Sequence, residues 1–374
     1  MKKTAMGLSF AAVGVACAAC SATPPASSVQ ESDSLPANWS FVVLANPAND
    51  GSTSLDQPAA LLAIDQSGGQ HRVSVGPVLG GQATQRADGV LIMGASEDTL
   101  VSGSGTVVKP RVTAHSRIPY SFTPTGGVSL GIANDGGTES SYSSPLLTMT
   151  RTTETGEAPF EGSVEAAGVC GKKVIATTTP NISSDQLSTW ALTPKQDGGV
   201  AVRKIADIPE TLAQNHYLSS TGILCKGTNS FQLFSSDAAS KILRTSEVGQ
   251  QEQVQVTGPA GSLTNASRNN PGMNMVGDNL VLVDGELRFV SISTKTGVSI
   301  VVASLPEGTE DLDVFTSFAG NQAWALTREK NSTVVSIWQT DLTSGETKKV
   351  HDLPELSQYL DETGLEVTDF QIRQ

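Results

Sequence analysis

The chain has 374 residues, of which 37 are acidic and 24 are lysine or arginine, so its formal net charge is −13. With 38% hydrophobic residues and only four cysteines, it is too long for a disulfide-stapled mini-protein and too apolar for a disordered chain. One or two globular domains are expected. The acidic balance argues against nucleic acid or anionic lipid as a partner, because both attract a positive surface.

The first twenty residues have the pattern of an export signal. Lys2 and Lys3 precede an apolar run of small residues over 5–19, which has the length of a signal peptide and is too short to span a bilayer. The run ends in small residues around Cys17 and Cys20. This ending resembles the lipobox of bacterial lipoproteins, whose cysteine is acylated and becomes the mature N-terminus. The resemblance implies lipidation at Cys20, with Cys17 as the alternative position.

This signal divides the chain into three expected parts: a lipoprotein signal peptide over 1–19, a tether over 20–37 and a folded domain over 38–374. Residues 21–34 are small, polar and proline-containing, and such a composition is typical of a disordered spacer. We therefore expect an extracytoplasmic protein anchored to the cell membrane by an N-terminal lipid. Simple secretion after cleavage at Ala18 is the alternative.

Export changes the interpretation of the cysteines. Once Cys17 is removed and Cys20 is acylated, Cys170 and Cys225 are the two that remain. In an oxidising compartment an isolated pair favours a disulfide, and two buried free thiols are the alternative.

An internal repeat of about 48 residues runs through the rest of the chain. Similar Pro-Glu endings occur at 207–210, 304–307 and 352–355, and the last two are 48 residues apart. A turn with a glycine and then a strand precede each ending, as in a β-hairpin whose tight turn needs positive φ. The expected turn glycines are Gly68, Gly156, Gly198, Gly249, Gly297 and Gly345. The interval of 88 residues between the first two hides one degenerate unit.

Each unit contains a buried apolar strand, an alternating strand, a tight turn and an exposed strand, which is the order within a four-stranded blade. Seven such units fit between residue 38 and the C-terminus. The pattern resembles a seven-bladed β-propeller, with six or eight blades as alternatives, and implies an all-β fold. The repeats are degenerate relatives of WD40-like and quinoprotein-like units: residues 63–69 are similar to part of the quinoprotein repeat, but the docking tryptophan is absent. Because quinone-dependent dehydrogenases usually have eight blades and a vicinal disulfide, pyrroloquinoline quinone is disfavoured.

The two ends of the chain are expected to share one blade, because an open ring would leave two edge strands unpaired. The alternating run over 365–372 follows the last outer strand, so we expect it to pair within the blade that also contains 41–44. Between them, residues 354–364 carry apolar residues at helical spacing before a glycine, which predicts a short helix. The repeat also places Cys170 and Cys225 at near-equivalent positions of adjacent blades, so their disulfide would join two blades.

The chain offers no motif for catalysis or metal binding. Residues 127–131 fit the G-x-S-x-G nucleophile elbow, but a turn rather than a helix follows, so we expect an inner blade strand. His71 and His351 fall on predicted outer strands, whereas His115 and His216 could face the central channel.

Acidic turns at 49–51, 134–136 and 310–313 contain oxygen ligands of the kind calcium uses, but without the spacing of an EF-hand. We therefore expect plain turns, no catalytic residue, no metal site and no cofactor.

Two functions remain. The first is a non-catalytic binding or scaffold protein for a cell-envelope or membrane-protein partner. The second is a lactonase-, glycosidase- or cyclase-like hydrolase with acidic residues at the channel. Three or more carboxylates or histidines converging in the channel would favour catalysis, whereas an apolar patch on one end of the ring would favour binding. We favour binding, because the sequence shows no catalytic constellation.

Overall fold

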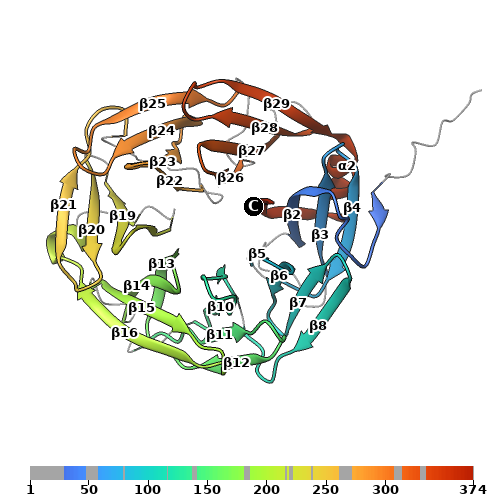
Figure 1. Ribbon diagram of the computed structural model, residues 1–374, viewed down its shortest axis with the longest axis horizontal. Helices are drawn as coiled ribbons and strands as arrows, with labels where there is room; N and C mark the ends of the chain where they lie inside the picture. The colour runs from blue at the N-terminus through green and yellow to red at the C-terminus, as the bar shows by residue number, and fades with distance from the viewer. Residues whose placement is uncertain are drawn as a thin grey trace, which may run out of the picture.

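Strands make up nearly all of the regular structure in the computed structural model (Figure 1). It describes residues 29–47, 58–78, 81–115, 117–136, 141–180, 186–214, 217–218, 222–236, 239–260, 272–306, 314–328 and 334–373. Within these residues the strands form seven sheets around a central axis, with two short helices. The seven-bladed β-propeller predicted from the repeat is confirmed.

Each sheet is one blade, and in blades 2 to 7 the strands follow one another from the channel outward in chain order. Blade 2 consists of β5 (Ala83–Arg86), β6 (Gly89–Met93), β7 (Glu97–Ser102) and β8 (Gly105–Pro110). Blade 3 consists of β9 (Tyr120–Phe122), β10 (Ser129–Ile132), β11 (Leu146–Met149) and β12 (Thr155–Ala158). Blade 4 consists of β13 (Ser163–Cys170), β14 (Lys173–Thr179), β15 (Ser188–Pro194) and β16 (Val200–Asp207), followed by α1 (Glu210–Ala213).

The innermost strand of blade 5 is split in two, and both parts pair with the same neighbour. Blade 5 consists of β17 (Tyr217–Leu218), β18 (Leu224–Lys226), β19 (Asn229–Ser235), β20 (Ser240–Ser246) and β21 (Gln251–Gln255). Blade 6 consists of β22 (Asn274–Val276), β23 (Asn279–Val283), β24 (Arg288–Ser293) and β25 (Ser299–Ser304). Blade 7 consists of β26 (Phe315–Ala319), β27 (Gln322–Arg328), β28 (Val335–Asp341) and β29 (Thr347–Leu353).

Blade 1 joins the two ends of the chain, as predicted. Its innermost strand is β30 (Leu365–Ile372), which pairs antiparallel with β2 (Trp39–Pro47). Outside β2 follow β3 (Ala59–Asp65), β4 (Gln70–Val75) and β1 (Gln30–Glu31), the last of which lies parallel to β4. The predicted helix is α2 (Pro354–Thr363), which leads into β30 and ends at Gly364 with φ of 67°.

The hydrophobic core lies between neighbouring blades. Second strands such as β23 are buried beyond their first residue, because their apolar side chains face a blade on either side, whereas outer strands such as β16 are mostly exposed. One core cluster, for example, joins Phe231 and Ile242 of blade 5 to Leu280 and Val290 of blade 6. Each blade therefore depends on both of its neighbours for burial.

The turn glycines of the repeat have a second role besides positive φ. A Cβ on Gly297 would lie 1.9 Å from the carbonyl oxygen of Gln255, which ends the outer strand of the preceding blade. The corresponding distance is 2.6 Å from Gly249 to Ile205 and 2.5 Å from Gly345 to Val302. Each hairpin thus leans on the outer strand before it, and glycine is needed for this close approach.

Two turns depart from the predicted pattern. Gly156 lies within β12 rather than in a turn, and the hairpin before it is made by Thr153, with φ of 61°. Gly156 is required for another reason, because a Cβ there would lie 2.4 Å from the carbonyl oxygen of Gly198. The unit hidden in the 88-residue interval is blade 2, whose turn at Gly103 and Ser104 is followed by Gly105 with φ of 126°.

Part of the predicted tether over 20–37 contacts the propeller, and residues 20–28 lie outside the described residues. Its described part, residues 29–37, packs along the outside of blades 1 and 2 (Figure 1). Leu35 is buried, and its N–H donates to the carbonyl oxygen of Ser102 at 2.9 Å. The hydroxyl of Thr106 donates to the carbonyl oxygen of Asp33 at 2.6 Å. These contacts hold the segment against the turn and outer strand of blade 2.

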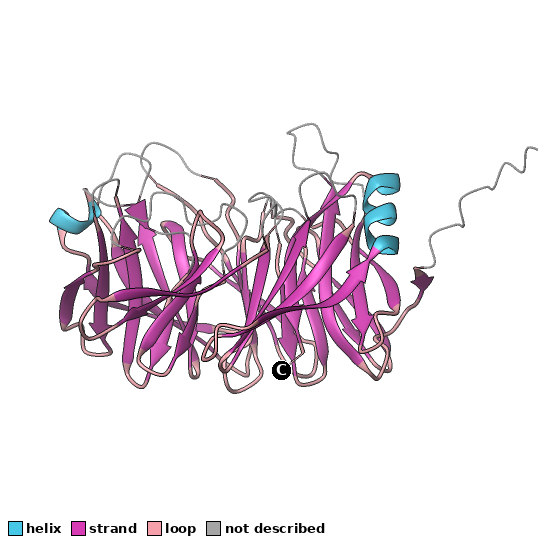
Figure 2. Ribbon diagram, turned by 90° about the horizontal axis from the view of Figure 1, so that it is seen from above, coloured by secondary structure: helices cyan, strands magenta, loops and turns pink. Residues whose placement is uncertain are grey.

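The two ends of the ring differ (Figure 2). The hairpin face carries the tight turns between first and second and between third and fourth strands, such as 66–69 and 171–172. The loop face carries both helices and the connections between blades. No helix in the described part of the chain is long and apolar enough to cross a membrane. Cys17 and Cys20 lie outside the described residues.

Candidate functional site

The one place that all seven blades approach is the central channel, which contains a cavity of about 320 Å³. Its walls come from the innermost strands and the residues next to them (Figure 1). Its polar side chains are those of Gln82, Tyr120, Asn274, Thr316, Ser317 and Gln371, and its aromatic side chains are those of Tyr120, Phe122 and Phe318. Among the described lining residues there is no carboxylate, histidine, lysine or arginine.

Tyr120 is the one phenol on this wall. Burial, with a smaller effect of the nearby Glu165 carboxylate, raises its pKa to about 12. Its hydroxyl donates to the backbone carbonyl of Glu165 at 3.0 Å. The residue is therefore neutral at physiological pH and serves as a ring surface rather than as an acid or base.

Gln371 is held by a buried carboxyl group directly behind the channel wall. Asp369 is fully buried on β30 and accepts hydrogen bonds from the N–H of Ala83 at 2.8 Å and of Phe370 at 2.9 Å. Nε2 of Gln371 lies 3.2 Å from both Asp369 oxygens. Since Ala83 belongs to blade 2, Asp369 joins the closing strand to the next blade and fixes the Gln371 amide at the same time.

Burial raises the pKa of Asp369 to about 6, although the hydrogen bonds from Gln371, Ala83 and Phe370 oppose this rise. The folded state therefore binds this proton more tightly than the unfolded chain, and the resulting stability is lost as the pH rises through 6. Between pH 4 and pH 7 we expect the unfolding free energy of the wild type to fall by about 2–3 kcal/mol relative to that of Asp369→Asn. Urea titrations of both proteins at the two pH values test this.

Asp341 provides a control, because its pKa is shifted in the opposite direction to that of Asp369. Backbone N–H groups of Ser344 and Thr343 lower the pKa of this exposed carboxyl, so its contribution grows as the pH rises through the acid range. If Asp369→Asn and Asp341→Asn shift the pH dependence in the same direction, the assignment to Asp369 is wrong.

His115 does not lie in the described wall of the channel, contrary to the alternative considered for it. Its imidazole is fully buried between blades 2 and 3, with Nδ1 2.9 Å from Asp135 and Nε2 3.6 Å from Glu157. Asp135 belongs to one of the acidic turns, where the side chain of the preceding Asn134 accepts the N–H of Gly136. Asp135 thus lies in an ordinary turn, and its carboxylate contacts the imidazole of His115 at the junction of two blades.

A second buried pair lies at the same junction between blades 2 and 3. Nη2 of Arg111 is 2.5 Å from Asp98, and both side chains are almost completely buried. Burial raises the pKa of Asp98 to about 6 despite the attraction of Arg111. This pair connects β7 to the segment after β8. Neither group reaches the channel wall described above, so the pair offers no surface to a substrate there.

The remaining candidates have structural positions. Ser129 of the G-x-S-x-G segment starts β10, and its hydroxyl lies 2.9 Å from that of Thr123. His71 and His351 lie on the outer strands β4 and β29, as predicted. In the described part of the chain no group of three acidic, histidine or cysteine residues could hold a metal ion. His216 and the acidic turns at 49–51 and 310–313 lie outside the described residues.

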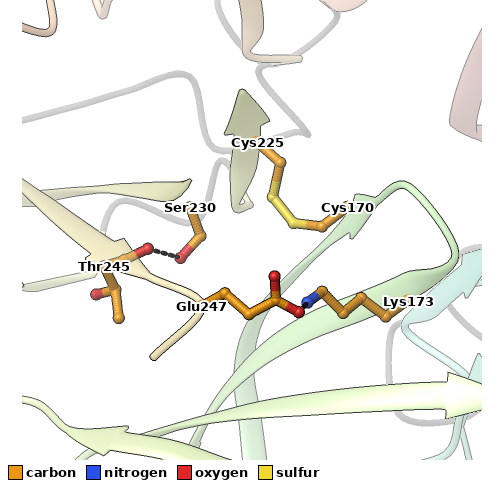
Figure 3. The surroundings of a disulfide bond; sticks show 6 residues. All are labelled: Cys170, Lys173, Cys225, Ser230, Thr245 and Glu247. Carbon is orange, nitrogen blue, oxygen red and sulfur yellow. Dashed lines mark hydrogen bonds and ion pairs between the residues drawn. A yellow bond between two sulfur atoms is a disulfide. The ribbon is translucent and has the colours of Figure 1, made fainter. Parts of the chain in front are cut away.

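Cys170 and Cys225 form a disulfide in the structure, and it joins β13 of blade 4 to β18 of blade 5 (Figure 3). Their Cα atoms are 5.3 Å apart. Beside it, Nζ of Lys173 in blade 4 lies 2.5 Å from the carboxylate of Glu247 in blade 5. The bond and the ion pair connect the same two blades near the hairpin face, around a cavity of about 190 Å³.

Reduction of this disulfide is expected to lower the unfolding free energy by about 4 kcal/mol, because it opens a loop of 55 residues in the unfolded chain. Guanidinium titrations with and without dithiothreitol measure the change. A Cys170→Ser/Cys225→Ser variant should be insensitive to the reductant. Equal stability of the oxidised and reduced wild type would contradict the expectation.

A larger cavity of about 590 Å³ lies on the loop face between blade 7 and blade 1. Its wall is mainly apolar and includes Phe315, Leu326, Leu360 and Val367, while Arg328 and Asp361 form an ion pair of 3.3 Å within it. The four apolar residues also belong to, or pack against, the core cluster that holds α2 and the closing strand in place. This cavity is therefore continuous with the core at the ring closure.

Sequence reasoning missed the residues of the channel wall, because they come one to three at a time from seven blades and form no motif. One local signal was available. Thr368 and Asp369 are two consecutive polar residues that interrupt the alternation of the closing strand, and buried polar residues must have partners.

Comparison with known proteins agrees with the fold. The model of the YycP β-propeller domain matches residues 50–373. In fold the chain is similar to the crystal structure of a "putative 6-phosphogluconolactonase" from Bacteroides uniformis ATCC 8492, with 13% identity and a TM-score of 0.54 over 89% of this chain and 99% of that one.

Other solved propellers are less similar. A quinonprotein alcohol dehydrogenase-like protein from Bacteroides thetaiotaomicron VPI-5482 has 12% identity and a TM-score of 0.49 over 84% of this chain and 75% of that one. Apo AztD from Citrobacter koseri has 10% identity and a TM-score of 0.48 over 90% and 98%. No curated protein matches the chain. The family match covers most of the sequence, and the chain belongs to the YycP β-propeller domain family.

Proposed function

We propose that this protein is an extracytoplasmic, lipid-anchored binding protein that holds a cell-envelope or membrane-protein partner and catalyses no reaction. The observation that carries the proposal is the uncharged wall of the central channel. General acid–base or nucleophilic catalysis needs at least one titratable or activated side chain in contact with the substrate. The described channel wall has amides, hydroxyls and aromatic rings instead, which are suited to recognition.

The other titratable groups support the same proposal. His115, Asp98 and Asp369 are buried and joined to residues of their own or neighbouring blades. Each has a structural partner, and none belongs to the described channel wall. Among the described residues, the exposed large apolar side chains are spread over blades 2, 4, 5 and 6 or their connections. A partner is therefore expected to bind at the channel and its rim.

The membrane anchor in this proposal is Cys20, following the signal over 1–19. The described chain starts at Val29 on the outside of blade 1. The eight residues between Cys20 and Val29 allow a separation of at most about 30 Å when extended. An acidic propeller on so short a tether would remain close to the membrane, within reach of an envelope partner.

The test is purification of the tagged full-length protein from its native membranes in mild detergent, compared with a Cys20→Ala strain. We expect a near-stoichiometric partner with the wild type and its loss when the anchor is removed. The Cys20→Ala protein should appear in the soluble extracytoplasmic fraction. Recovery of the wild-type protein in that same fraction, without a partner, would contradict the proposal.

A further inference from the structure

The channel wall restricts the charge of any ligand. Its described side chains include no ionised group, and Tyr120 stays neutral because it is buried. A charged molecule entering the cavity would lose its hydration without meeting an opposite charge, which is costly. The wall therefore selects for an uncharged ligand.

The wall presents a hydrogen-bond acceptor in a fixed orientation. Nε2 of Gln371 is occupied by both oxygens of Asp369, each 3.2 Å away. The amide oxygen Oε1 is consequently the polar atom that Gln371 offers to the cavity, and the buried carboxylate prevents the amide from turning.

Two hydroxyl groups of blade 7 add hydrogen-bond donors to the wall. The hydroxyl oxygen of Ser317 accepts the N–H of Ile372 at 3.2 Å, which places it beside the strand of Gln371, and that of Thr316 accepts the N–H of Gly272 at 2.8 Å, before blade 6. A hydroxyl that accepts one hydrogen bond still has its own hydrogen to donate. The wall thus contains donors and an acceptor, a combination that matches ligand hydroxyl groups, which both donate and accept.

Aromatic rings form another part of the wall. Tyr120 and Phe122 project from the same strand of blade 3, with ring centroids 6.2 Å apart and planes inclined by 11°. Phe318 contributes a further ring from blade 7. Rings of this kind pack against the C–H faces of sugar rings. The cavity of about 320 Å³ is at the lower end of the range for small-molecule sites.

From the neutral wall, the paired donors and acceptor, and the aromatic rings, we propose that the central channel binds an uncharged saccharide of one or two rings. The inference deepens the proposed function and rests on it for the source of the ligand, a glycan of the cell envelope. The contacts to Gln371, Ser317 and Thr316 orient the sugar hydroxyls, and Tyr120, Phe122 and Phe318 hold the ring faces.

The experiment titrates the full-length protein in mild detergent with glucose, N-acetylglucosamine, cellobiose and diacetylchitobiose. Glucuronate and glucosamine serve as charged analogues of similar size. Binding is followed by saturation-transfer NMR and calorimetry. We expect at least one neutral sugar to bind about tenfold or more tightly than either charged analogue.

Two variants place the binding in the channel. Val169→Glu introduces a charge at a lining residue that is 39% exposed, so the fold tolerates it, and affinity should fall about tenfold or more. Gln371→Leu removes the oriented acceptor and should also weaken binding. Gln253→Glu adds the same charge on the exposed outer strand β21 and should leave binding unchanged. Unfolding curves identify any variant that fails to fold.

Three results would overturn the inference: no neutral sugar binds below about 10 mM, a charged analogue binds as tightly as the best neutral sugar, or Val169→Glu binds like the wild type. Capture of a membrane partner by a protein that binds none of the sugars would overturn this inference alone. Hydrolysis of a bound disaccharide, visible in the anomeric NMR signals, would instead overturn the non-catalytic function and leave the ligand class standing.

Discussion

Removal of residues 365–374 is expected to abolish the cooperative folding of the whole ring. This deletion takes away β30, the innermost strand of blade 1, with the buried side chains of Leu365, Phe370 and Ile372. It also leaves an edge of β2 unpaired and the core between blades 7 and 1 open to water. The loss should be comparable to the entire stability of a domain, about 5–15 kcal/mol. Urea unfolding followed by near-ultraviolet circular dichroism measures it.

A chain that ends at Ile372 is the matched control, because it loses Arg373 and Gln374 but keeps the closing strand. It should unfold cooperatively, with a modest loss of the hydrogen bonds from Arg373 to the carbonyl oxygens of Ser40 and Ala37. A cooperative transition of near-normal stability in the chain that lacks 365–374 would show that ring closure does not depend on β30.

Replacement of Gly297 by alanine should lower the unfolding free energy by about 3–5 kcal/mol. The new Cβ would lie 1.9 Å from the carbonyl oxygen of Gln255 in the preceding blade, and φ at this position is 71°. Both the backbone strain and the steric clash must be relieved by moving the hairpin away from β21. Chemical denaturation of the purified variant measures the loss.

Gly277→Ala separates these two causes. Gly277 has a similar φ of 63°, but no atom lies within 4 Å of the position its Cβ would take. This control should cost only about 1 kcal/mol, from backbone strain alone. Equal losses for the two variants would mean that contact between the hairpin and the preceding blade contributes little to stability.

The architecture could be predicted because most blades require a glycine at the same hairpin turn. Gly198, Gly249, Gly297 and Gly345 recur at nearly regular spacing, since each must adopt positive φ and approach the outer strand of the blade before it. The closing strand was predictable for a related reason, because an alternating run beyond the last hairpin had no other strand to pair with.

The predicted turn glycine of blade 3 was wrong, because another residue adopts the positive φ that the turn requires. Thr153 adopts the left-handed conformation in the turn of blade 3, so the turn precedes Gly156, where it was predicted. The close contact of Gly156 with Gly198 nevertheless demands glycine. Residues 29–37 have the composition of a spacer, yet Leu35 finds a buried position against blade 2. Composition alone does not reveal a surface that only the folded ring provides.

The candidate site was less predictable than the fold. The cysteine pair was recognisable because only two cysteines follow residue 20 and the repeat places them in adjacent blades. Gln371, Ser317 and Tyr120, by contrast, are separated by up to 251 residues and meet only because the blades form a ring. His115 had the residue type expected of a channel group, but its neighbours Asp135 and Glu157 hold it between two blades.

The most direct test of binding at an uncharged channel compares three anchored proteins purified from native membranes: the wild type, Val169→Glu and Gln253→Glu. Copurified protein is quantified by mass spectrometry and copurified glycan by monosaccharide analysis. The account predicts that the wild type and Gln253→Glu retain the same envelope partner in near-stoichiometric amount, and that Val169→Glu loses it. Equal retention by all three proteins would place the partner elsewhere on the ring and contradict the account.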